Sequence, residues 1–121
     1  MGEWKMSDAA VFTELDQCLV LTCPPRLSDQ GYLRLREESF RLCSARTFRA
    51  VIIDLSAVEL LDLEEWGQLL DLERGLRLIG SKSWLVGLRP ALAGALIMLG
   101  AEIDSFSYAQ RVEDAILSSR S

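Results

Sequence analysis

The sequence predicts an α/β domain in which helices cover a mostly parallel sheet. Two short apolar runs have the continuous hydrophobic character of strands that are buried on both faces, namely AVIIDL at residues 50–55 and SWLVGL at residues 83–88. The segments around these runs carry apolar residues at helical spacing. Strands that alternate with amphipathic helices are typical of a parallel sheet with crossover helices.

The N-terminal part of the chain predicts a hairpin and a first helix. Residues 11–23 form two β-rich stretches around Asp16-Gln17, and such a hairpin adds an antiparallel edge to the sheet. Ser28 is expected to cap a helix that runs to about Ala45. The inward face of this helix is predicted to carry Tyr32, Leu35, Leu42 and Cys43.

Two further helices follow the buried strands. The second helix is expected to start after Asp62 and to stop before Gly80, and its outward face is predicted to carry Glu64, Glu65, Asp71 and Glu73. The third helix, which Pro90 opens, is apolar nearly all round, and this predicts a position in the core. A weak strand at residues 103–106 and a short helix at about residues 110–117 complete the order β-β-α-β-α-β-α-β-α.

The length and composition bound the domain organisation. With 121 residues, 50% of them hydrophobic, the chain is expected to form one domain over residues 1–121, with residues 1–10 as a flexible tail. The longest apolar run is interrupted by proline and glycine, and it is shorter than the roughly 20 residues that a membrane-spanning helix requires. The N-terminus lacks the apolar stretch of a secretory signal, so the cytoplasm is the expected location.

The residue types exclude most kinds of reactive site. The chain contains no histidine, so it lacks the commonest general base and metal ligand, and it has no glycine-rich phosphate-binding motif. We therefore expect no catalytic, cofactor-binding or metal-binding residues. Cys18, Cys23 and Cys43 are expected to be reduced and buried as small apolar residues. The net charge of −5 argues against nucleic acid as a partner and against attraction to anionic lipid.

Five short motifs occur in an order that is found in a known family. They are Asp54-Leu55-Ser56, Leu60-Leu61-Asp62, Ile79-Gly80, Gly87-Leu88-Arg89-Pro90 and Leu99-Gly100. The chain in this respect resembles the STAS family, the domain of anti-sigma-factor antagonists, and most of all the short scaffold proteins of the bacterial stressosome. The resemblance implies the STAS fold, with a mixed, mostly parallel sheet of roughly four or five strands and about four helices. It also implies a non-enzymatic protein-interaction module of a stress or sigma-factor partner-switching system.

The chain departs from the family at the position that serves as the switch. In the family, a serine or threonine directly follows the aspartate that begins the second helix, and a cognate kinase phosphorylates it. Here Asp62 is followed by Leu63, which has no hydroxyl group. The added charge of a phosphate, about −1.5 to −2, cannot be placed at this position. The resemblance therefore implies that partner binding is independent of phosphorylation.

The candidate partner-binding surface is centred on the start of the second helix. Its residues are Ser56, Asp62, Leu63, Glu64, Glu65, Arg89 and Pro90. These residues have simpler structural interpretations as well. Ser56 could make a local backbone hydrogen bond or cap, and the carboxylates could cap the helix. Leu63 could fill a local gap, Arg89 could be a solvated residue at the helix entry, and Pro90 could simply open the third helix. The partners that the resemblance implies are other STAS proteins and a serine kinase or anti-sigma factor of the histidine-kinase-like ATPase fold, in an oligomeric assembly.

Three alternative functions remain open at this point. The chain could be a STAS subunit that docks on a membrane transport ATPase. It could be a small enzyme with a flavodoxin-like sheet, although the absence of histidine and of a phosphate loop argues against this. It could also be a structural component of a shell or cage, in which assembly is the whole function.

Overall fold

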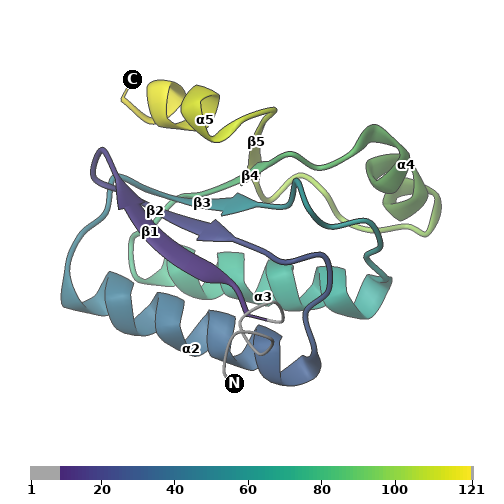
Figure 1. The fold of residues 1–121 in the computed structure, drawn as a ribbon, viewed down its shortest axis with the longest axis horizontal. Helices are drawn as coiled ribbons and strands as arrows, with labels where there is room; N and C mark the ends of the chain where they lie inside the picture. The colour runs from purple at the N-terminus through teal and green to yellow at the C-terminus, as the bar shows by residue number, and fades with distance from the viewer. Residues whose placement is uncertain (1–8, 121) are drawn as a thin grey trace, which may run out of the picture.

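The computed structural model describes residues 9–120, which form a five-stranded sheet with helices on both faces (Figure 1). The elements in chain order are β1 (Val11–Leu15), β2 (Cys18–Thr22), α2 (Asp29–Ala45), β3 (Ala50–Asp54), α3 (Leu63–Leu78), β4 (Ser83–Val86), α4 (Pro90–Met98), β5 (Ser107–Ala109) and α5 (Val112–Ser119). The strand order is β1-β2-β3-β4-β5, with β1 antiparallel to β2 and all other neighbours parallel. This confirms the predicted fold class. The predicted N-terminal tail lies almost entirely outside the described residues.

The helices are placed unequally around the sheet. Helices α2 and α3 cover one face, α5 lies on the other, and α4 lies beyond one end of the sheet (Figure 1). Strand β3 is buried on both faces because its side chains alternate between the two layers: Val51 and Ile53 pack under α2 and α3, whereas Ala50 and Ile52 pack under α5. The continuous apolar run of this strand is therefore explained by its central position in the sheet.

The predicted hairpin is present, and an ionic cluster holds its turn. Asp16 and Gln17 both have positive φ, at 50° and 64°, which is the backbone twist that two-residue hairpin turns require. Asp16 Oδ2 accepts hydrogen bonds from Arg120, at the end of α5, and from Arg49 at 3.0 Å. These hydrogen bonds, first from Arg120 and then from Arg49, lower the pKa of Asp16. The turn is thus tied to the C-terminal end of the described chain.

The last strand does not lie where the sequence predicts it. The prediction placed a strand at residues 103–106, but β5 is Ser107–Ala109, and the final helix is likewise shifted towards the C-terminus. Pairing decides the strand: residues 107–109 pair with Trp84–Val86 of β4, although the segment is only three residues long and Tyr108 is its one residue with a strong preference for strands. Phe106 is buried just before the strand and packs edge to face on Trp66. The apolar residue at position 106 thus belongs to the core and not to the strand.

The prediction that the third helix belongs to the core is wrong for most of its length. Only Leu92 and Leu96 of α4 are buried, whereas Ile97, Met98 and the following Leu99 are 54%, 90% and 59% exposed. Because α4 lies beyond the end of the sheet, a single stripe of its surface meets the core. Ala93 is partly buried, and the remaining apolar residues of this helix are exposed.

The prediction that Glu73 faces solvent is also wrong. Its side chain is buried with a relative exposure of 4%, because position 73 lies one turn from the core residues Leu69 and Leu76. One carboxylate oxygen is 3.4 Å from Arg77 Nε, and the other has no hydrogen-bond partner among the described residues. The charge is therefore only partly compensated by its neighbours.

The cysteines behave as the sequence predicts. Cys18, Cys23 and Cys43 are free and buried. Burial, followed by the charge of Asp54, raises the pKa of Cys23 to about 12, so this group stays a neutral thiol at physiological pH. Within residues 9–120, no helix is both long and apolar enough to cross a membrane.

A glycine in the β4–α4 connection permits a close contact that positions the candidate site. Gly87 has a φ of 72°, and a β-carbon added to it would lie 2.2 Å from Ser56 Oγ and 2.9 Å from Ser56 N. The backbone of Gly87, in the connection that follows β4, therefore packs directly against Ser56, in the connection that follows β3. A larger residue at position 87 would force them apart.

The Gly87 contact predicts a large effect of one methyl group. Gly87→Ala should lower the free energy of unfolding by about 1–3 kcal/mol or more, because it combines a strained positive φ with a steric clash. Gly94→Ala is the matched control, since Gly94 lies in α4 with no atom within 4 Å of an added β-carbon. This control should raise stability by up to about 1 kcal/mol. Urea unfolding of both variants measures the difference, and equal stabilities would contradict the close packing.

The ionic cluster at the turn predicts a pH-dependent contribution to stability. The pKa of Asp16 is lowered in the folded state, so its charge stabilises the fold above the ordinary value of 3.8, and this contribution disappears as the pH falls through the lowered value. Asp16→Asn should therefore be less stable than the wild type near neutral pH and equal to it in strong acid. Denaturant unfolding measured as a function of pH tests this. Two parallel curves would show that the carboxylate contributes nothing.

Candidate functional site

The predicted site lies at the end of the sheet where the parallel strands terminate. The carboxyl ends of β3 and β4 meet there, and α3 and α4 begin at the same end of the molecule (Figure 1). Residues 55–62 connect β3 to α3, and residues 87–89 connect β4 to α4. Connections at this end of a parallel sheet commonly carry the functional residues of α/β proteins.

Ser56 and Arg89 are brought together at this end. The Ser56 N–H and hydroxyl both donate to Asp54 Oδ1, at 2.9 and 2.6 Å, which folds the chain back directly after β3. The hydroxyl is therefore engaged locally, but its acceptor is the Asp54 carboxylate and not the backbone group that the sequence predicts. Arg89 Nη2 donates to the Ser56 carbonyl at 3.3 Å, so the two connections share a direct hydrogen bond. Arg89 and Pro90 themselves are exposed.

The start of α3 is fixed by a reciprocal pair of hydrogen bonds. Asp62 Oδ1 accepts from the Glu65 N–H at 2.7 Å, and Glu65 Oε1 accepts from the Asp62 N–H at 2.9 Å. This capping box satisfies backbone donors that the first turn of the helix leaves free. The predicted capping role of Asp62 is confirmed. The exposed Glu64 adds a negative charge at the positive end of the helix.

Exposed leucines flank the capping aspartate. Leu60 is 68% exposed and Leu63 is 44% exposed, whereas Val58 and Leu61 of the same connection are buried and anchor it to the core. Leu63 is the first residue of α3, so its backbone lies in the turn that the capping box fixes. Leu63 does not fill a gap in the core. Its exposed side chain lies in sequence between the exposed carboxylates of Asp62 and Glu64.

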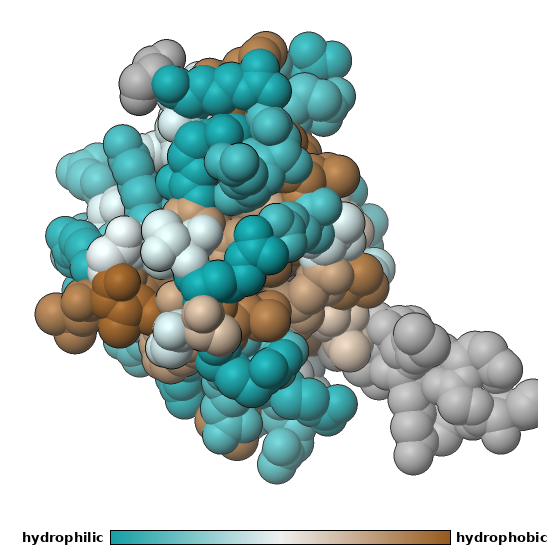
Figure 2. Space-filling model, turned by 90° about the vertical axis from the view of Figure 1, so that its left-hand side faces the viewer, coloured by the Kyte–Doolittle hydropathy of each residue, from teal (hydrophilic) through white to brown (hydrophobic). Residues whose placement is uncertain are grey.

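The opposite end of α3 provides a comparison. Figure 2 shows that end of the molecule, where hydrophilic side chains surround a protruding hydrophobic group. The exposed apolar residues at the C-terminus of α3 are Leu78, at 88%, and Ile79, at 45%. Exposure of leucine by itself therefore does not distinguish the candidate site. What differs at the start of α3 is the capping box, together with the Ser56–Arg89 contact between the neighbouring connections.

A pocket that the sequence analysis did not identify lies next to Arg89 and Pro90. Its volume is about 680 Å³, and it is lined by Gly87, Leu88, Arg89, Pro90, Ala93, Ile103, Tyr108, Ala109 and Gln110. The Tyr108 hydroxyl donates to the Ile103 carbonyl. Partial burial, followed by the charge of Asp104, raises the pKa of Tyr108 to about 12. The lining residues come from segments that only the β4–β5 pairing brings together, so no local sequence pattern could have revealed the pocket.

The described residues show no arrangement suited to metal binding. In the part of the chain from residue 9 to residue 120, no three or more cysteine and carboxylate side chains gather as a group that could hold a metal ion. The carboxylates of Asp62 and Glu65 are both used in capping the helix. This end of the molecule instead carries exposed leucines and the pocket beside Arg89.

Known proteins with this architecture share both sequence and fold with the chain. The RsbT co-antagonist protein RsbRC of Bacillus subtilis is 33% identical over 97 residues, which cover 78% of this chain and 34% of RsbRC. The chain thus spans about a third of the length of this curated relative.

Solved structures give the same result for the fold. RsbS of Moorella thermoacetica, solved as a Ser-to-Glu variant, matches with a TM-score of 0.80 and 22% identity, over 92% of this chain and 94% of RsbS. A chain of the stressosome, described as a signal integration and transduction hub, matches with a TM-score of 0.80 and 23% identity, over 91% of this chain and 96% of its own. The STAS domain model matches residues 9–115. This chain therefore belongs to the STAS domain family.

Proposed function

We propose that this chain is a non-enzymatic protein-interaction module of a bacterial stress or sigma-factor partner-switching system, acting in the cytoplasm. Membership of the STAS family and the relation to RsbRC, whose name describes it as a co-antagonist of RsbT, support this role. The partners are other STAS proteins, in an oligomer, and a serine kinase or anti-sigma factor of the histidine-kinase-like ATPase fold.

The observation that carries the proposal is the exposed Leu63 at the first position of α3. The resemblance to the family implies that this is the position of the phosphorylatable hydroxyl. A leucine there keeps an apolar, uncharged contact available at all times, because no kinase can add a phosphate to it. Partner binding is therefore constitutive with respect to phosphorylation at this position.

The surface around Leu63 has the composition of a contact surface. Leu60 and Leu63 supply apolar area, Asp62 and Glu64 supply negative charge, and Arg89 supplies a positive charge on the neighbouring connection. Interfaces typically combine an apolar centre with a charged rim and are enriched in arginine. A partner that complements this surface presents apolar side chains flanked by basic residues.

Two of the alternatives from the sequence gain no specific support. Docking on a membrane transport ATPase and a flavodoxin-like enzymatic activity both stay predictions without a structural feature that favours them. A purely structural role in a shell would require the same assembly with other STAS chains as the proposed function. It differs from the proposal only in that no kinase or anti-sigma factor is bound.

Phosphorylation can be tested directly by mass. The wild-type chain, incubated with the cognate kinase and ATP, should keep its intact mass, and Leu63→Ser should gain one phosphate per chain. Leu60→Ser is the control: it places a hydroxyl on a leucine that is more exposed than Leu63 and does not follow the capping aspartate. A stoichiometric phosphate on the wild type would overturn phosphorylation-independence.

Binding can be tested with a charge at the start of α3. Leu63→Lys should weaken the partner complex by about tenfold or more, because it places a charge in a desolvated contact. Leu78→Lys puts the same change at the far end of the same helix, on a side chain that is 88% exposed, and should leave affinity unchanged. Calorimetric titration with the partner measures both, and thermal unfolding verifies that both variants are folded. Equal affinities of the two variants would place the interface elsewhere.

A further inference from the structure

The pocket beside Arg89 has the dimensions and lining of a small-molecule site. Its volume of about 680 Å³ lies within the range of about 300–1,000 Å³ that is usual for ligand pockets. Leu88, Pro90, Ala93 and Ile103 contribute apolar walls, together with the ring of Tyr108. The Tyr108 hydroxyl is already used in a hydrogen bond to the Ile103 carbonyl. Most of the pocket therefore suits a hydrocarbon group.

The charge in the pocket is positive and is concentrated at one place. Arg89 is the charged residue among the lining residues, and no carboxylate lines the pocket. Its guanidinium has the Ser56 carbonyl as a hydrogen-bond partner at 3.3 Å and forms no salt bridge within residues 9–120. The remaining donors of the guanidinium can bind an anionic group, for which carboxylate has the matching geometry.

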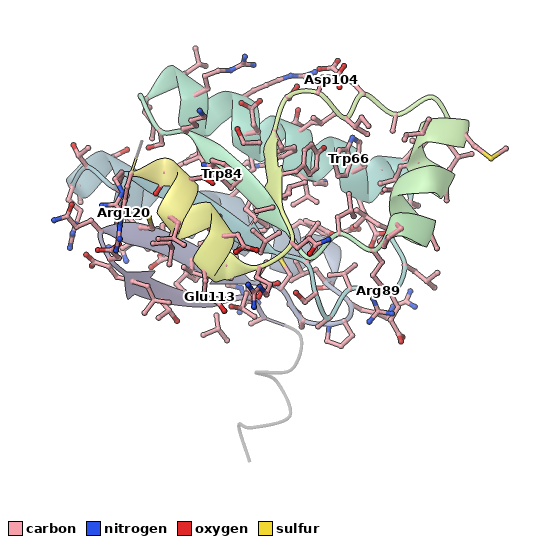
Figure 3. The ribbon with its side chains drawn as sticks, turned by 90° about the horizontal axis from the view of Figure 1, so that it is seen from above. Trp66, Trp84, Arg89, Asp104, Glu113 and Arg120 are labelled. Atoms are coloured by element: carbon pink, nitrogen blue, oxygen red, sulfur yellow. The ribbon has the colours of Figure 1, made fainter. Side chains whose placement is uncertain are left out.

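Two further features determine which end of the pocket favours negative charge. No side chain caps the N-terminus of α4, whose first turn contributes Pro90 and Ala93 to the pocket, so the positive end of this helix is not compensated there. The acidic neighbour Asp104 follows Ile103 in sequence, but Figure 3 shows Arg89 and Asp104 on opposite sides of the molecule in that view. The Arg89 end of the pocket is therefore the end that favours negative charge.

From these observations we propose that the pocket binds a small amphipathic carboxylate. Its carboxylate pairs with the Arg89 guanidinium, and its hydrocarbon chain lies against Leu88, Ala93 and Ile103. Neither the substitution at Leu63 nor the identity of any protein partner enters this argument. The binding site holds whether or not the proposed partner-switching function does.

Sodium decanoate is a suitable probe of the full chain, at concentrations below its micelle formation. Calorimetric titration should give saturable binding of one decanoate per chain. Decanol has the same hydrocarbon chain without the charge, and decylammonium reverses the charge; both should bind at least about tenfold more weakly, since a charge-assisted hydrogen bond contributes about that factor. Backbone amide shifts should change for the lining residues.

Two pairs of variants separate the charge from the volume. Arg89→Gln should weaken decanoate binding about tenfold or more and abolish the preference over decanol, whereas Arg34→Gln, at an exposed arginine of α2, should change neither. Ala93→Phe should fill the pocket and weaken decanoate and decanol alike. Ala91→Phe, on the same helix but outside the pocket lining, should weaken neither.

The proposal is overturned by several results. One is the absence of saturable decanoate binding to the wild type. Another is decylammonium binding as tightly as decanoate, and a third is affinity for decanoate that Arg89→Gln leaves unchanged. If Ala93→Phe weakens a protein partner while the wild type binds no decanoate, the pocket accommodates a partner's side chain, and the small-molecule assignment is wrong.

Discussion

The parallel pairing of β3 with β4 is the constraint on which the rest of the structure depends. It aligns the carboxyl ends of the two central strands, so the connections to α3 and α4 leave the sheet side by side. Gly87 lets these connections approach until only a hydrogen atom fits against Ser56, and Arg89 then bonds across to the Ser56 carbonyl. The candidate partner surface and the pocket beside it are both consequences of this one alignment. Because the aligned strands are buried on both faces, the positions of these connections are determined by the core.

Helix capping and surface chemistry are combined at the start of α3. Asp62 and Glu65 satisfy each other's backbone donors, and this fixes the first turn of the helix. Leu63 lies in this fixed first turn, and its side chain is exposed to solvent. A hydroxyl at the same position would be accessible to a kinase, and a leucine offers only apolar contact. Arg89 lines the pocket and also bonds to the Ser56 carbonyl, so the pocket adjoins the connection that leads to Leu63.

The sequence predicts the features that depend on local pattern and misses those that depend on long-range pairing. The hairpin at Asp16, the buried β3 and the cap at Asp62 follow from residues that are adjacent or a few positions apart. Strand β5 forms because its backbone pairs with β4, which a segment of three residues does not reveal. The exposed end of α4 and the buried Glu73 depend on where a helix lies relative to the sheet. The pocket joins residues 87–93 with 103–110, so only the folded chain defines it.

The central claim is that partners bind at the end of the sheet where α3 and α4 begin. Hydrogen exchange of the backbone amides, measured on the free chain and on its complex with the cognate kinase or a second STAS protein, tests this claim directly. We expect added protection in residues 56–65 and 87–93, and unchanged exchange at the opposite end of α3. Protection confined to the exposed edge strand β1, or to the C-terminal end of α3, would contradict it.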